Sequence, residues 1–419
     1  MTIDLSDNPI LEIVKRTNVA SQYLNIVSGN IRQQGVKAIA LALEDSFDYI
    51  LEANTLDLEM SREMAVSELM IDWLKLTPER LETTVRILKY LSKSADPTKR
   101  LINAPYQLES CQTYCQLMPL GTIALIYEAI PEIAAIAAGM CIKTGNSLVL
   151  RGCSTASNSN IAIAKIIQAA LAETELPSGC IEVISSDLGT EIADLLVQDS
   201  YLDLIIPYGR PSFVQQIVEQ ATAPVLKTAI GNCYLYWSSS GDLELVRHLI
   251  IDSHKSEPDP VNAIEKVLIN GNKKSSTLLS LFNSLREQGF KLKGDVNLVE
   301  EFPEYLRLSS PSEWGQPYLD KTIAFRYINS LAEAVEWINS YSSGHADCLA
   351  TESYEESRLF SRGVNSALVY INSSPRFSRH PNSGDVVFLG MSNQKGFRQG
   401  LIGLETFTTL KQIVQGEGC

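Results

Sequence analysis

The sequence lacks any apolar run long enough to cross a membrane. Its longest, Ile133–Ile142, is rich in alanine and glycine, whereas a spanning helix needs about 20 mostly apolar residues. This run therefore predicts a buried helix. The first ten residues also lack a basic segment followed by an apolar one, so no secretory signal is expected. We expect a cytoplasmic protein that does not bind membranes.

Basic charge is scarce as well. Lysine and arginine total 35 against 49 aspartates and glutamates, which gives a formal net charge of -14. The basic residues are scattered along the chain, whereas a surface that binds a phosphate backbone needs them clustered. The sequence therefore argues against nucleic acid as a partner.

Cysteine and histidine do not occur at the spacing of metal ligands. The eight cysteines stand singly, without a Cys-x-x-Cys pair, and the four histidines are also dispersed, so we expect no metal site. Cys141 and Cys233 lie in apolar runs and are predicted to be buried thiols. His345 and Asp347 are predicted to be hydrogen-bonding loop residues rather than catalytic ones.

The composition is that of an ordinary globular protein, with 45% apolar and 20% charged residues. A chain of 419 residues exceeds the usual size of a single core, which favours two domains. Residues 8–95 have helical periodicity, and residues 101–117 alternate as in an exposed β-ribbon. From Leu120 onward, short β-rich runs alternate with helical segments, a pattern that predicts βαβ units and parallel sheets.

This alternation predicts specific elements. In the first β/α run the expected strands are 122–127, 147–150, 181–184, 202–206 and 234–237. The expected helices of that run are 132–142, 157–172, 189–198 and 211–220. In the second run we expect strands 267–269, 323–326, 348–350 and 368–371, with helices 276–288 and 331–340. Residues 401–414 look extended and are expected to pair with the ribbon.

We therefore divide the chain into three parts. A nucleotide-binding domain comprises residues 1–100 and 118–232, and its N-terminal part is helical. A catalytic-type α/β domain comprises residues 233–395. The ribbon 101–117 and residues 396–419 form a small β arm whose unpaired strand edges need covering, so we expect a homo-oligomer, a dimer or larger.

The dinucleotide fingerprint Gly-x-Gly-x-x-Gly does not follow the first strand. Other motifs appear in order along the chain: Ile126–Pro131, Ile142–Gly152, Leu202–Pro207, Gly344–Asp347, Val369–Asn372 and Gly403–Glu405. In these motifs the chain closely resembles γ-glutamyl phosphate reductase (glutamate-5-semialdehyde dehydrogenase), a branch of the aldehyde dehydrogenase superfamily. The resemblance spans nearly the whole sequence.

The resemblance implies an α/β, aldehyde-dehydrogenase-like fold. It would have a Rossmann-type parallel-sheet nucleotide domain, a second α/β catalytic domain and a small β oligomerisation arm. It also implies NADPH-dependent reduction of L-glutamate 5-phosphate to L-glutamate 5-semialdehyde in proline biosynthesis. In the family a cysteine thiolate displaces phosphate to give a thioester, which hydride then reduces.

The chain departs from the family at that cysteine. The family loop reads Arg-Pro-Ser-x-Cys-Asn, with a glutamate three residues after the asparagine. The matching Asn262 and Glu265 place Val261 at the position of the cysteine. Valine has no nucleophilic atom, and loss of a nucleophile has cost about 10⁶ in turnover elsewhere. The alternative function is therefore a catalytically inactive paralogue that acts as a binding or regulatory oligomer.

Three further departures affect the expected oxyanion and nucleotide sites. Glu132 occupies the position of the family's oxyanion-binding asparagine, where a carboxylate would repel the oxyanion and raise the pKa of a nearby thiol. The family's Pro-Arg-Gly-Gly loop reads Pro-Tyr-Gly-Arg over residues 207–210, and Ser154 replaces a lysine suited to the 2′-phosphate of NADP. We expect weakened NADPH binding, and no recovery of activity from Val261→Cys unless it is combined with Glu132→Asn and Arg210→Gly.

The remaining candidates carry open alternatives. Lys143, Gly145 and Gly209 would contact the coenzyme, although Lys143 and Gly145 would also suit a helix end and a tight turn. Arg151 ends a predicted strand, where it would hold a phosphate or ribose or form a surface ion pair. Arg376 and Arg398 are candidates for binding the substrate's anionic groups, since arginine can hold a carboxylate with two hydrogen bonds.

Overall fold

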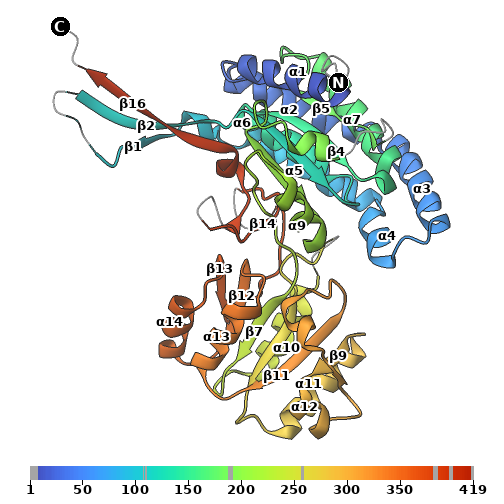
Figure 1. The fold of residues 1–419 in the computed structure, drawn as a ribbon, viewed down its shortest axis with the longest axis vertical. Helices are drawn as coiled ribbons and strands as arrows, with labels where there is room; N and C mark the ends of the chain where they lie inside the picture. The colour runs from blue at the N-terminus through green and yellow to red at the C-terminus, as the bar shows by residue number, and fades with distance from the viewer. Residues whose placement is uncertain are drawn as a thin grey trace, which may run out of the picture. The chain divides into compact units, whose positions relative to one another are not determined.

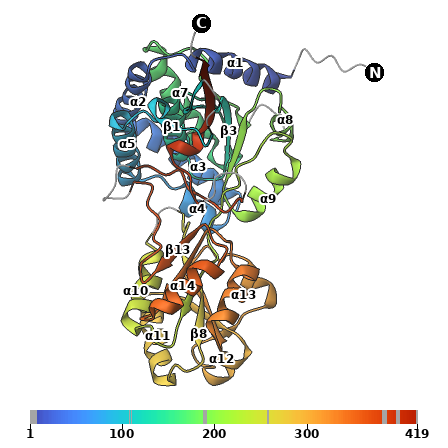
Figure 2. The same cartoon turned by 90° about the vertical axis from the view of Figure 1, so that its left-hand side faces the viewer.

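The computed structural model describes residues 8–106, 108, 111–186, 192–255, 259–380, 386–395 and 400–416. The chain forms two compact units (Figures 1 and 2). The first comprises Met1–Lys227, Arg379–Leu389 and Ile402–Cys419, and the second comprises Thr228–Ser378 and Gly390–Leu401. Within the described ranges, no helix has the length and hydrophobicity that crossing a membrane requires.

The first unit contains the N-terminal helices and those that cover its sheet. They are α1 (Pro9–Leu24), α2 (Gly29–Glu44), α3 (Phe47–Glu63), α4 (Glu68–Leu74), α5 (Pro78–Lys93), α6 (Ile133–Thr144), α7 (Ser157–Ala172), α8 (Ile192–Leu196) and α9 (Pro211–Gln220). Helix α5 shows why such segments are helical. Thr77 caps its first turn, Pro78 occupies an early position, and Leu81, Val85 and Leu88 are buried at helical spacing.

The sheet of the first unit has four parallel strands in the order β5-β4-β3-β6. The strands are β3 (Thr122–Tyr127), β4 (Ser147–Gly152), β5 (Ile181–Val183) and β6 (Leu204–Tyr208). Strands β3, β4 and β6 are buried along their whole length, as expected when both faces of a parallel sheet are covered. Helix α6 is buried at every position, which confirms the prediction of a buried helix in this segment.

The second unit is built on a seven-stranded parallel sheet in the order β10-β9-β11-β8-β7-β12-β13. Its strands are β7 (Cys233–Trp237), β8 (Ile264–Asn270), β9 (Lys291–Gly294), β10 (Arg307–Leu308), β11 (Thr322–Ile328), β12 (Ala346–Ala350) and β13 (Leu368–Ile371). One core cluster contains residues of α10 (Leu243–Ser253), α11 (Ser275–Glu287) and α12 (Val296–Glu301). Another contains residues of α13 (Leu331–Tyr341) and α14 (Tyr354–Gly363).

A three-stranded antiparallel arm belongs to the first unit. Strand β2 (Cys111–Pro119) lies between β1 (Leu101–Asn103) and β16 (Thr408–Gly416). Figure 1 shows β2 and β16 side by side, and they pair in register from Thr408 opposite Pro119 to Gly416 opposite Cys111. This pairing confirms the prediction that residues near 401–414 return to the ribbon. Two short strands, β14 (Met391–Ser392) and β15 (Gly400–Leu401), pair with each other in the second unit.

The arm leads to a prediction about assembly. Strand β16 is an edge strand with nine residues, and it exposes about half of Leu410 and Val414. Because such an edge presents unpaired backbone groups and apolar side chains, we expect at least a dimer at micromolar concentration. Light scattering coupled to size exclusion should show this, and Leu410→Lys with Val414→Lys should shift the mass toward the monomer. A monomeric parent chain under these conditions would contradict the prediction.

Candidate functional site

In the second unit, Val261 lies in the loop that enters β8, and its main chain holds it in place. Its side chain is fully buried. Its carbonyl oxygen accepts hydrogen bonds from the Gly231 N–H at 2.9 Å and from His345 Nε2 at 2.7 Å, and its own N–H donates to the Asp259 carbonyl at 2.9 Å. The position matched to the family's cysteine is thus fixed by contacts that do not involve the side chain.

His345 is committed to this anchoring role. Nε2 donates to the Val261 carbonyl, and Nδ1 lies 2.9 Å from the Ser343 hydroxyl oxygen, which also lies 2.8 Å from the Gly231 carbonyl oxygen. Burial lowers the pKa of His345 to about 4, which keeps the ring neutral. The Cys233 thiol lies 3.4 Å from Nε2. Burial raises the pKa of Cys233 well above its usual value, so the sulfur stays protonated at neutral pH.

The structure brings Asn262 and the segment of Arg376 together. The Asn262 amide donates to the carbonyl of Pro375 at 2.8 Å, and Asn262 is buried. Arg376 is half exposed, and its guanidinium lies 3.8 Å from an Asp252 oxygen. This separation leaves Arg376 able to bind an anion. The other predicted anion-binding residue, Arg398, lies outside the described residues.

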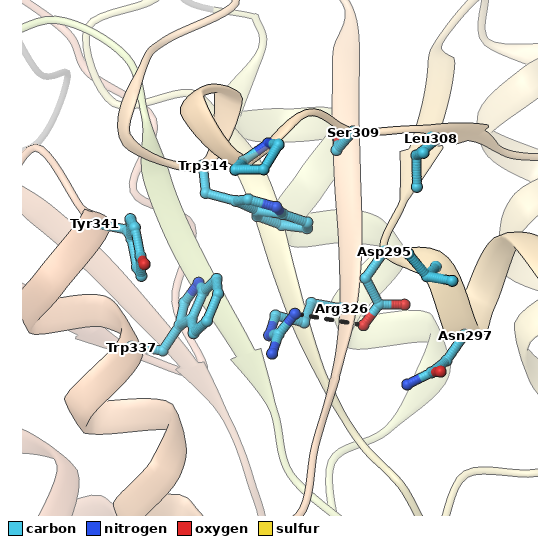
Figure 3. A pocket seen from close by; sticks show the side chains of 10 residues that line it. Asp295, Asn297, Leu308, Ser309, Trp314, Arg326, Trp337 and Tyr341 are labelled. Atoms are coloured by element: carbon cyan, nitrogen blue, oxygen red, sulfur yellow. Dashed lines mark ion pairs between the residues drawn. The ribbon is translucent and has the colours of Figure 1, made fainter.

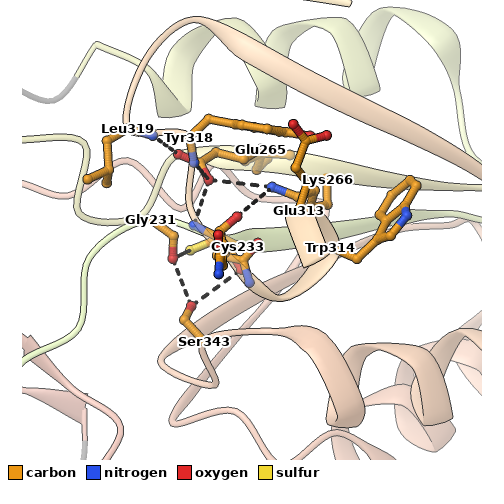
Figure 4. A network of polar contacts seen from close by, with 12 residues as sticks. Gly231, Cys233, Glu265, Lys266, Glu313, Trp314, Tyr318, Leu319 and Ser343 are labelled. Carbon is orange, nitrogen blue, oxygen red and sulfur yellow. Dashed lines mark hydrogen bonds and ion pairs between the residues drawn. The ribbon is translucent and has the colours of Figure 1, made fainter. Parts of the chain in front are cut away.

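Figure 4 shows a buried ion pair beside this loop that sequence reasoning did not identify as a site. Glu265 accepts hydrogen bonds from the backbone N–H groups of Asn232, Tyr318 and Leu319 at 2.7 to 2.9 Å. Lys266 Nζ lies 3.7 Å from Glu265 and 3.7 Å from the centre of the Tyr318 ring. Burial lowers the pKa of Lys266 to about 8. The pair ties the start of β8 to two neighbouring segments.

In the first unit, the carboxyl ends of β3 and β6 are joined by a second ion pair. Glu128 is buried, and its carboxylate accepts from Arg210 Nη2 and from the Arg210 backbone N–H, each at 2.8 Å. A Cβ atom added at Gly209 would lie 2.6 Å from a Glu128 oxygen, so the pair requires glycine there. Arg151 is the penultimate residue of the neighbouring strand β4, is buried and donates to the Gly152 carbonyl at 2.6 Å. Arg151 and Arg210 thus lie at the strand ends where nucleotides bind in such sheets.

Glu132 requires a correction. We expected an uncompensated carboxylate at this position, but Glu132 forms an ion pair with Arg80 in which Arg80 Nε lies 2.8 Å from Glu132 Oε1. The two side chains are only 7% and 13% exposed, and Arg80 also donates to the Trp73 carbonyl at 3.0 Å. The positive guanidinium offsets the repulsion that the sequence alone implied. The second oxygen, Oε2, is buried and has no hydrogen-bond partner among the described residues.

Lys143 and Gly145 also require a correction. They lie at the C-terminal end of α6, and Glu132 precedes its first turn, so a helix of 12 residues separates them by about 18 Å. Lys143 donates to the Ser94 carbonyl at 2.6 Å, and Gly145 has a φ of 83° that ends the helix. Both residues therefore lie at the amino ends of the strands, and these contacts favour the structural alternative over contact with a coenzyme.

The other buried thiols offer no evident nucleophile. Burial raises the pKa of Cys141 and of Cys348 above the usual value, and raises that of Cys180 to about 12. In the part of the chain that the structure describes, no three histidine, cysteine, aspartate or glutamate side chains are grouped so that they could hold a metal ion.

Comparison with known proteins gives consistent relatives. The sequence profile of the aldehyde dehydrogenase family matches residues 9–233. Gamma-glutamyl phosphate reductase 2 of a Synechocystis species is 55% identical over 417 residues, covering 100% of this chain and 99% of the relative. The gamma-glutamyl phosphate reductase of Gloeobacter violaceus is 36% identical over 404 residues and 96% of each chain.

Solved structures agree with these sequence relatives. The crystal structure of gamma-glutamyl phosphate reductase from Thermotoga maritima superimposes with a TM-score of 0.89 at 31% identity, over 98% of this chain and 99% of that one. A probable aldehyde dehydrogenase from Listeria monocytogenes shares the fold, with a TM-score of 0.71 at 15% identity over 97% and 96% of the two chains. These likenesses confirm the predicted α/β aldehyde-dehydrogenase-like fold.

The Arg80–Glu132 pair gives a stability prediction. Replacing Arg80 by methionine leaves a buried carboxylate without its partner, which should lower the free energy of unfolding by about 3 kcal/mol. Adding Glu132→Gln removes the stranded charge and should recover a large part of this loss. Urea unfolding of the two single variants and the double variant measures the coupling. Additive effects of the two substitutions would show that the ion pair does not form.

The buried His345 and Asp347 predict opposing effects of pH on stability. His345 has a folded-state pKa of about 4, so between pH 4 and 6.5 only the unfolded state binds its proton, and stability rises with pH. Burial raises the pKa of Asp347 to about 7. At pH values between the pKa of this carboxyl in the unfolded chain and pH 7, only the folded state keeps the proton, so stability falls as pH rises.

Replacing one of the two residues removes its contribution, so the pH dependence of stability that the other causes should become measurable. Stability should fall as pH rises in His345→Gln and should rise with pH in Asp347→Asn, each by at most about 1.4 kcal/mol per pH unit relative to the parent. Urea unfolding at several pH values between 4 and 6.5 measures this. If both variants follow the pH dependence of the parent, these residues do not titrate as described.

Proposed function

Because the chain belongs to the γ-glutamyl phosphate reductase family, a branch of the aldehyde dehydrogenase superfamily, we propose that it reduces L-glutamate 5-phosphate to L-glutamate 5-semialdehyde in proline biosynthesis. The observation that carries this proposal is 55% identity over the whole chain to a protein named gamma-glutamyl phosphate reductase 2. The similar fold of the Thermotoga maritima reductase supports it.

The coenzyme that we propose is NADPH, which would supply the hydride when bound. The carboxyl ends of the first unit's strands carry Arg151 and Arg210, and the Arg210 side chain is 41% exposed although it is paired with Glu128. Guanidinium groups suit phosphate because they offer several N–H donors in one plane. From the sequence, the replacement of glycine by Arg210 suggested weaker binding of the coenzyme. The position of Arg151 and Arg210 at the strand ends instead supports contact with a nucleotide phosphate.

The chemistry must differ from the family's route, since Val261 offers no thiol. We infer that hydride adds directly to the carbonyl carbon of the acyl phosphate. The carbonyl oxygen becomes an oxyanion, which then reforms the C=O bond as the bond to phosphate breaks. The acid carbon is thus reduced to an aldehyde, phosphate leaves with the former bonding pair, and no acyl-enzyme forms. In this scheme Arg376 binds an anionic group of the substrate, and Asn262 holds the segment before it through the Pro375 carbonyl.

A second candidate is a binding or regulatory oligomer without catalytic activity. The observation that favours it is Val261, a fully buried and chemically inert residue at the position that the sequence match assigns to the family's nucleophile. Both candidates keep the fold and ligand binding, so turnover distinguishes them.

The test is the reverse reaction, phosphate-dependent oxidation of glutamate semialdehyde with NADP. The reductase proposal predicts turnover above background but at least ~100-fold below the ordinary enzyme value of about 10 s⁻¹, because nucleophilic catalysis is missing. Treatment with iodoacetamide should leave this turnover unchanged. If calorimetry shows that both ligands bind but no turnover is measured, the reductase proposal fails and the second candidate stands.

Restoring the cysteine provides a separate test. We expect Val261→Cys to raise turnover by less than ~10-fold, because burial would raise the pKa of the new thiol and the Nε2 hydrogen of His345 is committed to a carbonyl. Val261→Ala controls for the change of size. A rise of ~100-fold that iodoacetamide abolishes would show that the site can activate a thiol.

The structure also changes the result expected from combining Val261→Cys with Glu132→Asn and Arg210→Gly. Glu132→Asn would leave Arg80 without its carboxylate, and Arg210→Gly would leave Glu128 buried and unpaired. The combination with Val261→Cys should therefore lose stability, whatever it gains in chemistry.

A further inference from the structure

The second unit contains a pocket that the proposed reaction does not use. It has a volume of about 320 Å³ and lies beside the start of α12, strand β11 and helix α13 (Figure 3). This volume is at the lower end of the range for ligand pockets, which suits one small molecule rather than a nucleotide.

Aromatic rings form one side of the pocket. The Trp314 and Trp337 rings meet edge to face at 5.9 Å, and the Tyr341 ring lies 4.4 Å from that of Trp337. Trp314 is nearly buried, with 5% of its surface exposed, so its ring is held in place by its surroundings. These rings offer a rigid apolar surface for an aliphatic or cyclic group.

Arg326 supplies incompletely used hydrogen-bond donors. Its guanidinium stacks 3.9 Å from the centre of the Trp337 ring, and its Nη1 lies 3.7 Å from Asp295 Oδ2, which is too long for a hydrogen bond. Its Nε is buried and has no hydrogen-bond partner among the described residues. A guanidinium held flat against a ring can bind a carboxylate end-on, through parallel hydrogen bonds from its two Nη atoms.

The charges in the pocket restrict the ligand further. The Asp295 side chain is 9% exposed and accepts from the Leu298 backbone N–H at 3.0 Å. Figure 3 shows Arg326 directed toward Asp295, with Asn297 nearby. Because the pocket carries one positive and one negative group, a simple anion would lie beside the Asp295 carboxylate and be repelled. A ligand that carries both charges would match both groups.

We propose that this pocket binds a single α-amino acid with an apolar side chain. Its carboxylate pairs with Arg326, its ammonium group lies toward Asp295 and Asn297, and its side chain packs against Trp314 and Trp337. The assignment rests on the second unit alone and does not depend on the proposed reaction.

L-Phenylalanine is the first probe and L-leucine the second, measured by calorimetry and by tryptophan fluorescence, since two of the four tryptophans line the pocket. We expect saturable binding of at least one of them. Two analogues that each lack one charge, 3-phenylpropionate and 2-phenylethylamine, should bind at least ~10-fold more weakly than L-phenylalanine.

Arg326→Gln should weaken amino-acid binding at least ~10-fold. Arg358→Gln is the matched control, because Arg358 also lies over an aromatic ring, that of Tyr354, but on α14 outside the pocket. If Arg326→Gln does not fold, Trp337→Leu replaces it. The proposal is overturned if neither amino acid binds, if 3-phenylpropionate binds as tightly as L-phenylalanine, or if the folded pocket variant binds like the parent.

Discussion

The main-chain hydrogen bonds of Val261 are the constraint on which the account of this site depends. The carbonyl of Val261 accepts from Gly231 and from the imidazole of His345, while its N–H donates to Asp259. None of these bonds involves the side chain, so the loop can keep its course whether residue 261 is a cysteine or a valine. A close structural likeness to a γ-glutamyl phosphate reductase can therefore coexist with the loss of the family's nucleophile. The backbone of the loop can thus be kept while the side chain at residue 261 decides whether a covalent intermediate can form.

Ion pairs explain why the other departures from the family are not isolated changes. Glu132 is bound to Arg80, and Arg210 is bound to Glu128, with both carboxylates largely buried. A buried charge is tolerated when a partner offsets its desolvation, and it becomes costly when that partner is removed. Each of these residues is therefore tied to its partner. Replacing either residue by the family's amino acid is therefore expected to disturb local stability.

Helices and strands were predicted well from the sequence where the two ends of an apolar pattern were evident. Strands β3 and β13 and helices α7 and α9 span the predicted residues, since each follows an apolar pattern of the expected period. Helices α10, α12 and α14 and strands β9 and β10 were not predicted. Helix α14 has only ten residues, is rich in charged side chains and buries only Phe360, so too few apolar residues mark it in the sequence.

The site was predicted less completely because its contacts join distant parts of the chain. Arg80 and Glu132 are 52 residues apart, and Glu128 and Arg210 are 82 residues apart, so one sequence cannot show that their charges offset each other. The match of Val261 to the family's cysteine rests on Asn262 and Glu265 in the same loop and stays a prediction. Lys143 and Gly145 were chosen as coenzyme candidates for a different reason. In a sequence, a glycine that ends a helix resembles a glycine that lets the backbone approach a phosphate.

The most direct test of a reaction without a covalent intermediate is mass spectrometry of the intact protein. The chain is mixed with glutamate semialdehyde and NADP in the absence of phosphate, quenched with acid and weighed. The thioester of a thiol-dependent enzyme would accumulate under these conditions, because phosphate is what releases it. If hydride transfer needs no acyl-enzyme, the protein keeps its unmodified mass, in a preparation that turns over once phosphate is added. A glutamyl group attached to any cysteine would contradict this prediction.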